Sequence, residues 1–251
     1  MEERITGRKN PLIQKVRRLA TSASERRKER LFLGDGTKLL EEAVRYWPGL
    51  DTVILADEVE AEVPESVRLV RVPREIMEYI SPMETPQGAV FLCRLPEKTA
   101  FVPKPGMLVL DGIQDPGNLG TILRTADAME IPVVLTPGCA DAYNPKTVRA
   151  AMGAVFRSQP QWTEAETLLE TCRQRLIPLY VTALSERAVD LRQADLRKAA
   201  MVIGSEGRGV GEFFLTHADR ELIIPMNPRC ESLNAAIAAA IVMWEMRSAN
   251  V

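Results

Sequence analysis

The sequence is poor in the residues that most hydrolytic and metal sites use. It contains one histidine, His217, which argues against triad hydrolases, His-rich metal sites and histidine acid–base chemistry. Its four cysteines lie far apart without a C-x-x-C pair, so neither a zinc knuckle nor a disulfide framework is expected. A reducing, cytoplasmic environment is therefore the expectation for this chain.

Long apolar runs are also missing. The longest covers residues 235–244 and is too short to span a bilayer. The initial Met-Glu-Glu-Arg is charged and no apolar run follows it, so we expect no secretory signal. Hydrophobic residues still make up 46% of the chain, enough for a sizeable core, and 251 residues allow one or two domains.

The net charge of −2 hides an asymmetry. Residues 1–30 carry ten basic and four acidic side chains, a balance of +6 that leaves −8 on the rest. A basic arm on an acidic body suggests contacts with phosphates, because neutralised phosphates release counterions. The alternative is a solvated amphipathic helix docked on the body, and the two can coexist. The arm has no aromatic residue, so it cannot stack bases itself. The docking residues would be Leu12, Val16 and Leu19, and the RNA-contacting residues Arg8, Lys9 and Lys15.

The remaining chain reads as two α/β blocks. In the first block the pattern predicts helices at 35–47 and 74–80 and strands at 52–56, 67–72 and 88–95. In the second it predicts strands at 107–111, 132–135, 177–182, 200–203 and 222–224, and helices at 118–129, 145–152, 164–175 and 232–247. Apolar strands that alternate with helices indicate a mostly parallel sheet covered on both faces. Three prolines mark a linker, so the expected division is an arm 1–30, an accessory domain 31–95, a linker 96–106 and a C-terminal domain 107–251.

Three loops of the second block carry residues suited to chemistry. In the first loop a strand ends in Asp-Gly and a helix follows, with Asn118 expected near its cap and Arg124 further along it. The second loop, 202–211, has four glycines, but neither the dinucleotide fingerprint nor the P-loop spacing. Its Glu206 would repel a pyrophosphate and suits a neutral or cationic ligand better. In the third loop Ser232 is predicted to cap the last helix, with Asn234 in the first turn.

Taken together, the three loops resemble a known family. N-L-G-T-I-L-R-T-A-D-A, G-S-E-G-R-G and I-P-M with S-L-N match, in order, the three signature motifs of the SpoU/TrmH family of the SPOUT superfamily. N-P-K at 144–146 and R-A-A-M-G-A-V-F at 149–156 lie between them. The resemblance is close over 107–251, whereas 1–95 resemble more loosely the substrate-binding domain of rRNA-modifying members, itself similar to a large-subunit ribosomal protein.

The resemblance implies an S-adenosylmethionine-dependent RNA 2′-O-ribose methyltransferase. Its expected fold is α/β, with a C-terminal parallel sheet that contains a deep trefoil knot and a small N-terminal α/β domain. It implies a homodimer without a metal, and cofactor contacts at Gly204, Gly207, Ile224, Met226 and Leu233. The implied catalytic residues are Arg124, with Glu206 as the residue that could orient it, together with Asn118, Ser232 and Asn234. Lys146 and Arg149 are candidate phosphate contacts, with a structural ion-pair role as the alternative.

Two positions depart from the family pattern. Asp35 stands where relatives commonly carry glutamate, and Met129-Glu130-Ile131 stands where a glycine is usual. The accessory domain favours large-subunit rRNA over tRNA as substrate, because the tRNA-modifying members lack a domain of this kind. A catalytically silent RNA-binding protein and a nucleotide-dependent oxidoreductase are the two rival hypotheses, and the missing dinucleotide fingerprint counts against the oxidoreductase.

Overall fold

The computed structural model describes residues 3–97, 99–227, 229–230 and 232–248, which form two compact units. The first unit contains residues 1–98 together with 143–157, and the second contains 99–142 together with 158–251. The expected C-terminal domain thus contributes one internal segment, 143–157, to the first unit. None of the helices in the described ranges is both long and apolar enough to cross a membrane.

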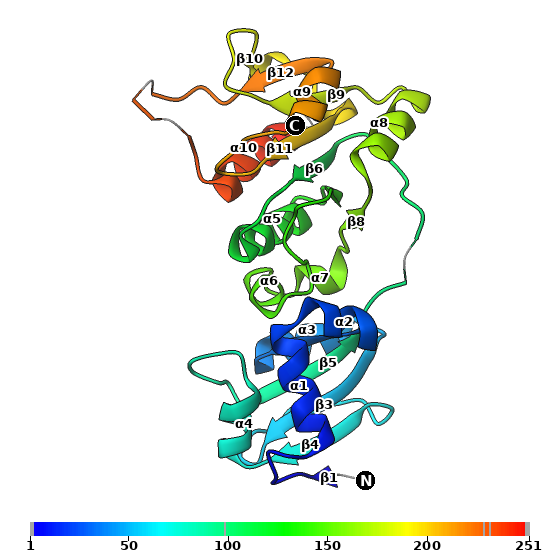
Figure 1. Ribbon diagram of the computed structural model, residues 1–251, viewed down its shortest axis with the longest axis vertical. Coiled ribbons are helices and arrows are strands. Elements are labelled where there is room, and N and C mark those ends of the chain that lie inside the picture. Colours follow the sequence, from blue (N-terminus) through cyan, green and yellow to red (C-terminus); the bar gives the residue numbers. More distant parts are fainter. Residues whose placement is uncertain (1–2, 98, 228, 231, 249–251) are drawn as a thin grey trace. The chain divides into compact units, whose positions relative to one another are not determined.

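The first unit is built on a five-stranded mixed sheet in the order β1-β4-β3-β5-β2, in which β5 runs antiparallel to both of its neighbours (Figure 1). Its strands are β1 (Glu3–Arg4), β2 (Leu31–Asp35), β3 (Leu50–Ala56), β4 (Arg68–Val72) and β5 (Ala89–Arg94). Its helices are α1 (Pro11–Thr21), α2 (Ala23–Glu29), α3 (Thr37–Tyr46), α4 (Arg74–Ile80), α6 (Pro145–Ala150) and α7 (Ala154–Arg157).

Helices cover both faces of this sheet, because successive strand residues point to opposite sides. Leu31, Leu33 and Val90 share one core with apolar residues of α1 and α4. The alternate residues Phe32 and Phe91 point to the other face. An aromatic cluster completes that face, made of Phe32, Trp47, Phe91, Tyr143 and Phe156 with ring centroids 4.8–6.2 Å apart in the contacting pairs. This cluster explains why segment 143–157 belongs to the first unit: its aromatic side chains fill a face that would otherwise be open.

The basic arm is folded into the first unit. It forms a short edge strand, β1, and two helices, α1 and α2, rather than the single helix expected. Leu12, Val16 and Leu19 are buried, as the docked-helix alternative predicts, and Ile13 is buried with them. Asn10 caps α1 by accepting from the N–H of Leu12, and Pro11 starts the helix. The apolar side of α1 is therefore core, which leaves its basic side chains on the outer side.

The second unit is a seven-stranded sheet in the order β10-β12-β9-β11-β6-β7-β8, and the strand pairs of its described residues are parallel, as predicted. Its strands are β6 (Met107–Asp111), β7 (Val133–Leu135), β8 (Gln161–Trp162), β9 (Leu179–Thr182), β10 (Val189–Asp190), β11 (Ala200–Gly204) and β12 (Arg220–Ile223). Its helices are α5 (Pro116–Ala128), α8 (Ala165–Gln174), α9 (Glu212–His217) and α10 (Ala235–Ser248), with single 3-10 turns at Leu191–Gln193 and Leu196–Lys198. The parallel sheet and the small N-terminal α/β domain confirm those parts of the predicted fold; the knot stays a prediction.

Two helix starts differ from the prediction. Asp115, not Asn118, caps α5, since its carboxylate accepts from the N–H of Asn118 at 2.8 Å. Asn234, not Ser232, caps α10, because its side-chain oxygen accepts from the N–H groups of Ala236 and Ile237 at 2.9 and 3.2 Å. The last helix therefore begins at residue 235, and Asn234 lies before its first turn rather than within it.

The departure at Glu130 has a direct backbone consequence. The residue follows α5 with φ +55°, in the left-handed region where glycine is favoured. Its carboxylate lies 3.1 Å from the guanidinium of Arg247 on α10, which also packs against α5. A glycine at position 130 would relieve the strain of the left-handed backbone, but it would also remove the ion pair with Arg247.

Candidate active site

A cavity of about 620 Å³ lies at the carboxyl ends of the central strands of the second unit. Strands β9, β11 and β12 lead into the loops that line it, and the segment before α10 closes one side. Ligands of parallel α/β sheets bind at this edge, and the volume is typical of a small-molecule site. All five predicted cofactor residues line the cavity: Gly204, Gly207, Ile224, Met226 and Leu233.

The glycine-rich loop forms a tight backbone turn against the end of β11. Ser205 and Gly209 exchange two backbone hydrogen bonds, at 3.1 and 2.9 Å. A Cβ on Gly204 would lie 1.9 Å from the carbonyl carbon of Gly209 and 2.1 Å from the nitrogen of Val210. Only glycine fits at 204, since the obstacle is backbone that cannot move alone. The loop thus presents main-chain groups along the cavity wall.

Three predicted catalytic residues, one from each signature motif, are joined by hydrogen bonds. The side-chain amide of Asn118, at the start of α5, donates to the Glu206 carboxylate in the glycine loop. The amide of Asn234, at the start of α10, donates to the Asn118 side-chain oxygen at 3.1 Å. These residues lie 88 and 116 positions apart in the sequence. The chain of bonds fixes the three loops against one another beside the cavity, where Glu206 is a lining residue.

The remaining two predicted catalytic residues are not part of this chain. Ser232 is exposed and lines the cavity. Arg124 is exposed and has no hydrogen bond or ion pair in the described part of the chain. Among the described residues Glu206 accepts from Asn118 and forms no ion pair with Arg124, so the orientation of Arg124 by Glu206 stays a prediction. Six residues further along α5, Arg124 is rotated by about 120° about the helix axis from Asn118.

The sequence patterns gave no role to Asp111, which connects two loops at this edge. At the end of β6 its carboxylate accepts from the N–H of Gly211 at 2.7 Å and from the hydroxyl of Thr136 at 3.1 Å. Gly211 is the last residue of the glycine-rich loop, and Thr136 follows β7. Asp111 thereby holds the distal end of the loop that lines the cavity. The sequence signal that could have marked Asp111 is a carboxylate at the end of an otherwise buried strand.

A second set that the sequence patterns did not mark lies at the cavity rim. Glu221, on β12, accepts from the Ser185 hydroxyl and from the Arg187 guanidinium, and all three residues line the cavity. The Glu221 side chain is only 10% exposed, whereas that of Arg187 is 80% exposed. No sequence motif marks these residues, since Ser185 and Glu221 meet only through the pairing of β9 with β12.

Comparison with known families decides the identity of the chain. A model described as the SpoU rRNA Methylase family matches residues 105–244, more than half of the chain. The chain belongs to the SpoU rRNA methylase family. This assignment confirms the resemblance and the methyltransferase class. The stretch that carries the cavity and the Asn118–Glu206–Asn234 chain lies inside the matched residues.

The first unit matches a second model, described as an MRM3-like substrate binding domain, over residues 10–90. A Bacillus subtilis relative, 23S rRNA (guanosine(2553)-2′-O)-methyltransferase RlmP, is 32% identical, with 98% of this chain and 99% of the relative covered. Human mitochondrial rRNA methyltransferase 3 is 27% identical, with 93% of this chain and 71% of the relative covered. A crystal structure of an AdoMet-bound rRNA methyltransferase from Sinorhizobium meliloti has a TM-score of 0.88 and 28% identity, with 100% of this chain and 99% of that chain covered.

This SpoU family member carries its predicted RNA-contacting residues on the first unit. Lys146 and Arg149 are exposed on α6, and Arg149 contacts Met83. Arg8 and Lys9 are exposed before α1, whereas the Lys15 ammonium lies 2.9 Å from the Glu29 carboxylate. That pairing neutralises Lys15 within the protein.

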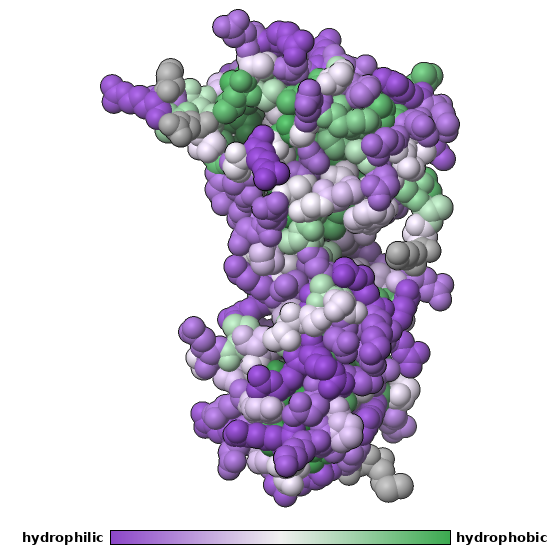
Figure 2. All heavy atoms as spheres, in the orientation of Figure 1, coloured by the Kyte–Doolittle hydropathy of each residue, from purple (hydrophilic) through white to green (hydrophobic). Residues whose placement is uncertain are grey.

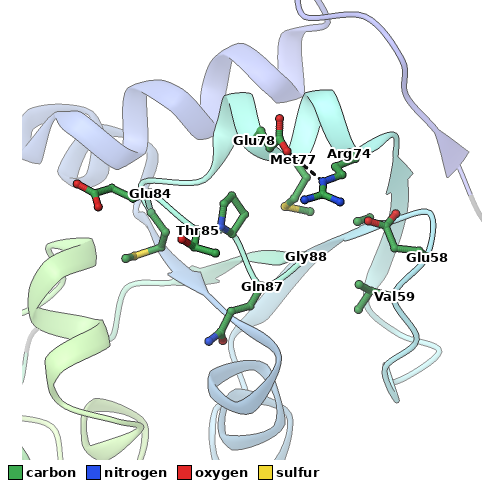
Figure 3. Close-up of a pocket in the computed structure, with 12 residues that line it drawn as sticks. Glu58, Val59, Arg74, Met77, Glu78, Glu84, Thr85, Gln87 and Gly88 are labelled. Atoms are coloured by element: carbon green, nitrogen blue, oxygen red, sulfur yellow. Dashed lines mark hydrogen bonds and ion pairs between the residues drawn. The ribbon is translucent and has the colours of Figure 1, made fainter.

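The first unit also contains a cavity of about 510 Å³ between α4, the end of β3 and the loop before β5 (Figure 3). Its charged lining residues are Arg74, Glu58, Glu78 and Glu84, and Arg74 is paired with Glu78 at 3.0 Å. An acidic lining disfavours phosphate binding. Among the described residues of this family member, no group of His, Cys, Asp or Glu side chains is placed to hold a metal ion.

Proposed function

We propose that this protein transfers the methyl group of S-adenosylmethionine to a ribose 2′-hydroxyl of large-subunit rRNA. The observation that carries the proposal is the hydrogen-bond chain from Glu206 through Asn118 to Asn234. It joins the three family motifs at the rim of a cavity with a glycine-rich wall. RlmP is named as a 23S rRNA 2′-O-methyltransferase, and the SpoU model and the substrate-binding model together span most of this chain.

The cavity fits S-adenosylmethionine in size and in chemistry. Backbone around Gly204 and Gly207 can bind polar edges of the ligand, and Ile224 and Leu233 supply apolar contact. The Glu206 carboxylate suits a ligand that carries a positive sulfonium. When bound, S-adenosylmethionine supplies an electrophilic methyl group; the protein's residues bind it, hold the ribose and exclude water.

Arg124 is the proposed catalytic residue, and its exposure without a partner among the described residues leaves its guanidinium available to RNA. An arginine side chain stays protonated, so it serves poorly as a general base. It holds the phosphate beside the target ribose and stabilises the negative charge that develops on the attacking oxygen. Asn118, Glu206, Ser232 and Asn234 shape its surroundings, and alignment of the two reactants supplies much of the acceleration.

The substrate-binding role falls to the first unit, and the methyltransferase role to the second. Exposed Lys146 and Arg149 on α6 and Arg8 and Lys9 beside α1 are proposed to contact RNA phosphates. Lys15 would contribute only after its pair with Glu29 opens. A tRNA substrate is the second candidate, and labelling of both RNA classes distinguishes them.

A homodimer is proposed through α10. Ile237, Ile241 and Trp244 follow one side of this helix at helical spacing and are 54%, 37% and 65% exposed. Exposed apolar stripes of this kind mark interfaces. Light scattering should give twice the mass of the 27.9 kDa chain, and Ile241→Glu should yield monomer.

A cytoplasmic location is proposed because rRNA is the proposed substrate and all four cysteines are free thiols.

The experiment that tests the reaction is transfer of tritium from labelled S-adenosylmethionine into total rRNA and total tRNA from a strain lacking this gene. Alkali-resistant linkages then locate the 2′-O-methyl group. Arg124→Ala should abolish transfer with little change in S-adenosylmethionine affinity, and Arg173→Ala, an exposed arginine on α8, serves as the matched control. Comparable turnover by Arg124→Ala would refute its role. Cofactor binding without label in either RNA would favour the catalytically silent binder.

A further inference from the structure

Two arginines of the arm converge on one aromatic ring of the first unit. The guanidinium carbon of Arg17 lies 4.1 Å from the centroid of the Tyr79 ring, and that of Arg8 lies 4.9 Å from it. Tyr79 projects from α4 and is half-buried against the core beneath α1. Gln14 reinforces the arrangement by donating to the backbone carbonyl of Arg8 at 2.7 Å. Two cations that lack an aromatic residue in their own segment therefore share a platform supplied by α4.

No carboxylate balances these two guanidiniums in the described part of the chain. Neither Arg8 nor Arg17 forms an ion pair there. The Arg17 guanidinium donates one hydrogen bond, to the backbone carbonyl of Tyr79 at 3.4 Å. The two guanidiniums carry like charges that repel each other, and the aromatic ring that they share compensates only in part. The arrangement is therefore short of negative charge.

The neighbouring basic residues of α1 are balanced internally, which sets Arg8 and Arg17 apart. Lys15 pairs with Glu29 at 2.9 Å, and Arg18 pairs with Glu25 at 3.4 Å. On α2, the buried Arg26 donates to the carbonyl of Leu19 at 2.7 Å. Hydrophilic side chains cover the side of the first unit on which α1 lies (Figure 2). In the described part of the arm, Arg27 and Arg30 are also exposed without a carboxylate partner, but only Arg8 and Arg17 share an aromatic ring, with the exposed Lys9 beside Arg8.

We propose that Arg8, Arg17 and Tyr79 form a clamp for a backbone phosphate of the substrate RNA. The inference rests on the proposed RNA methyltransferase function, and it adds Arg17 and Tyr79 to the residues proposed to bind RNA. The ring holds the two guanidiniums in place before RNA arrives, which lowers the entropy lost on binding. The guanidinium fork suits phosphate oxygens, and the missing carboxylate leaves its donors available. Because the arginines already occupy the ring, Tyr79 supports charge rather than stacking a base.

The test measures affinity of the full chain for a fluorescein-labelled single-stranded uridine 20-mer over a series of salt concentrations. Each phosphate contact contributes about 0.7 to the slope of log affinity against log salt for single strands. The double variant Arg8→Gln/Arg17→Gln removes this one contact and should reduce the slope by about 0.7, so its affinity relative to the parent should be about fivefold lower at 0.1 M salt than at 1 M salt. Each single variant should reduce the slope by part of that amount. Arg18→Gln, from the same helix but paired with Glu25, is the control and should leave the slope unchanged.

Tyr79 variants separate the platform from the charges. Tyr79→Phe keeps the ring and should bind as the parent does, whereas Tyr79→Leu should weaken binding although both arginines remain. Slopes of Arg8→Gln and Arg17→Gln equal to that of the parent would overturn the clamp, as would an equal effect of Arg18→Gln. Failure of the parent to bind the 20-mer at low salt would also overturn it. Failure of the proposed function is recognised separately, as absence of methyl transfer to rRNA by the parent protein.

Discussion

Replacing Asp111 with alanine is expected to weaken S-adenosylmethionine binding without abolishing the chemical step. Asp111 lies at the end of β6, where its carboxylate holds the N–H of Gly211 at 2.7 Å and the hydroxyl of Thr136 at 3.1 Å. Loss of the carboxylate releases the distal end of the loop whose glycines line the cavity. The loop must then be ordered by the ligand, and that cost is subtracted from the binding free energy.

The magnitude follows from the bonds that are lost. A hydrogen bond to a charged acceptor stabilises by about 1.5–3 kcal/mol. If the loop loosens fully, the same amount is lost from binding, which is roughly a 10- to 100-fold increase in Kd. The catalytic rate at saturating S-adenosylmethionine should change little, because Asp111 holds the loop and not the ribose. A raised KM with a retained kcat is therefore the expected signature.

Asp111→Asn is the matched control. Its amide oxygen can accept from Gly211, and its NH2 can donate to the Thr136 oxygen, whose hydroxyl still reaches the Leu110 carbonyl at 3.2 Å. Isothermal titration should therefore place Asp111→Asn within about threefold of the parent, a difference worth less than about 1 kcal/mol. An unchanged Kd in Asp111→Ala would refute the positioning role. A loss in Asp111→Asn as large as that in alanine would show that the negative charge matters and not the two bonds.

Three further predictions concern Gly204, Phe156 and Asp35. Gly204→Ala places a Cβ 1.9 Å from the Gly209 backbone. Overpacking of this kind costs about 1–3 kcal/mol, so titration should show S-adenosylmethionine binding weakened by about fivefold or more, and parental affinity would contradict the close approach. Phe156→Ala should lower the urea-unfolding free energy of the first unit by about 3–5 kcal/mol and leave cofactor affinity intact; loss of affinity instead would place its role in the second unit. Burial raises the pKa of the Asp35 carboxyl in the folded state, although the Ser81 hydroxyl and Arg149 act in the opposite direction. The folded protein therefore keeps the Asp35 proton to a higher pH than the unfolded chain does. As a result, the free energy of unfolding falls as the pH rises from the unfolded-state pKa to the folded-state pKa. Asp35→Asn should remove this fall in urea titrations from about pH 3 to about pH 7, and identical pH dependence in both proteins would argue against it.

The sequence predicted the strands of the second unit well because they are buried on both faces and are uniformly apolar. The run 200–203 shows this pattern, and β11 is buried throughout. It missed β2, where an apolar triplet follows a basic helix directly and ends in Gly34 and Asp35. The two-residue strands β1, β8 and β10 are shorter than any periodic pattern. For α5 a better signal was present, since Pro116 at the first helical position marks Asp115 as the cap.

The candidate site could be predicted only through the family resemblance. Nothing in local spacing brings Asn118, Glu206 and Asn234 together, because their contact depends on the order of β6 and β11 in the sheet. The resemblance supplied the residues but not the bond that the Asn118 amide donates to Glu206. For the arm, composition suggested both phosphate contacts and a docked amphipathic helix. Because one side of α1 is buried, deleting residues 1–30 would also remove core side chains. Point substitutions on the outer side of α1 are therefore the usable test of RNA binding.

The placement of segment 143–157 constrains how the first unit can bind RNA. Helix α1 and α4, with the proposed clamp, share the core on one face of the five-stranded sheet, whereas Tyr143 and Phe156, which flank α6, join the aromatic cluster on the other. However, Arg149 of α6 contacts Met83, just beyond α4, and α6 packs against the edge strand β2. The basic side chains of α6 therefore lie beside the edge of the sheet next to the helix that carries Tyr79. If both sets bind RNA, their contributions to the salt slope should add, and the RNA that contacts both passes around this edge.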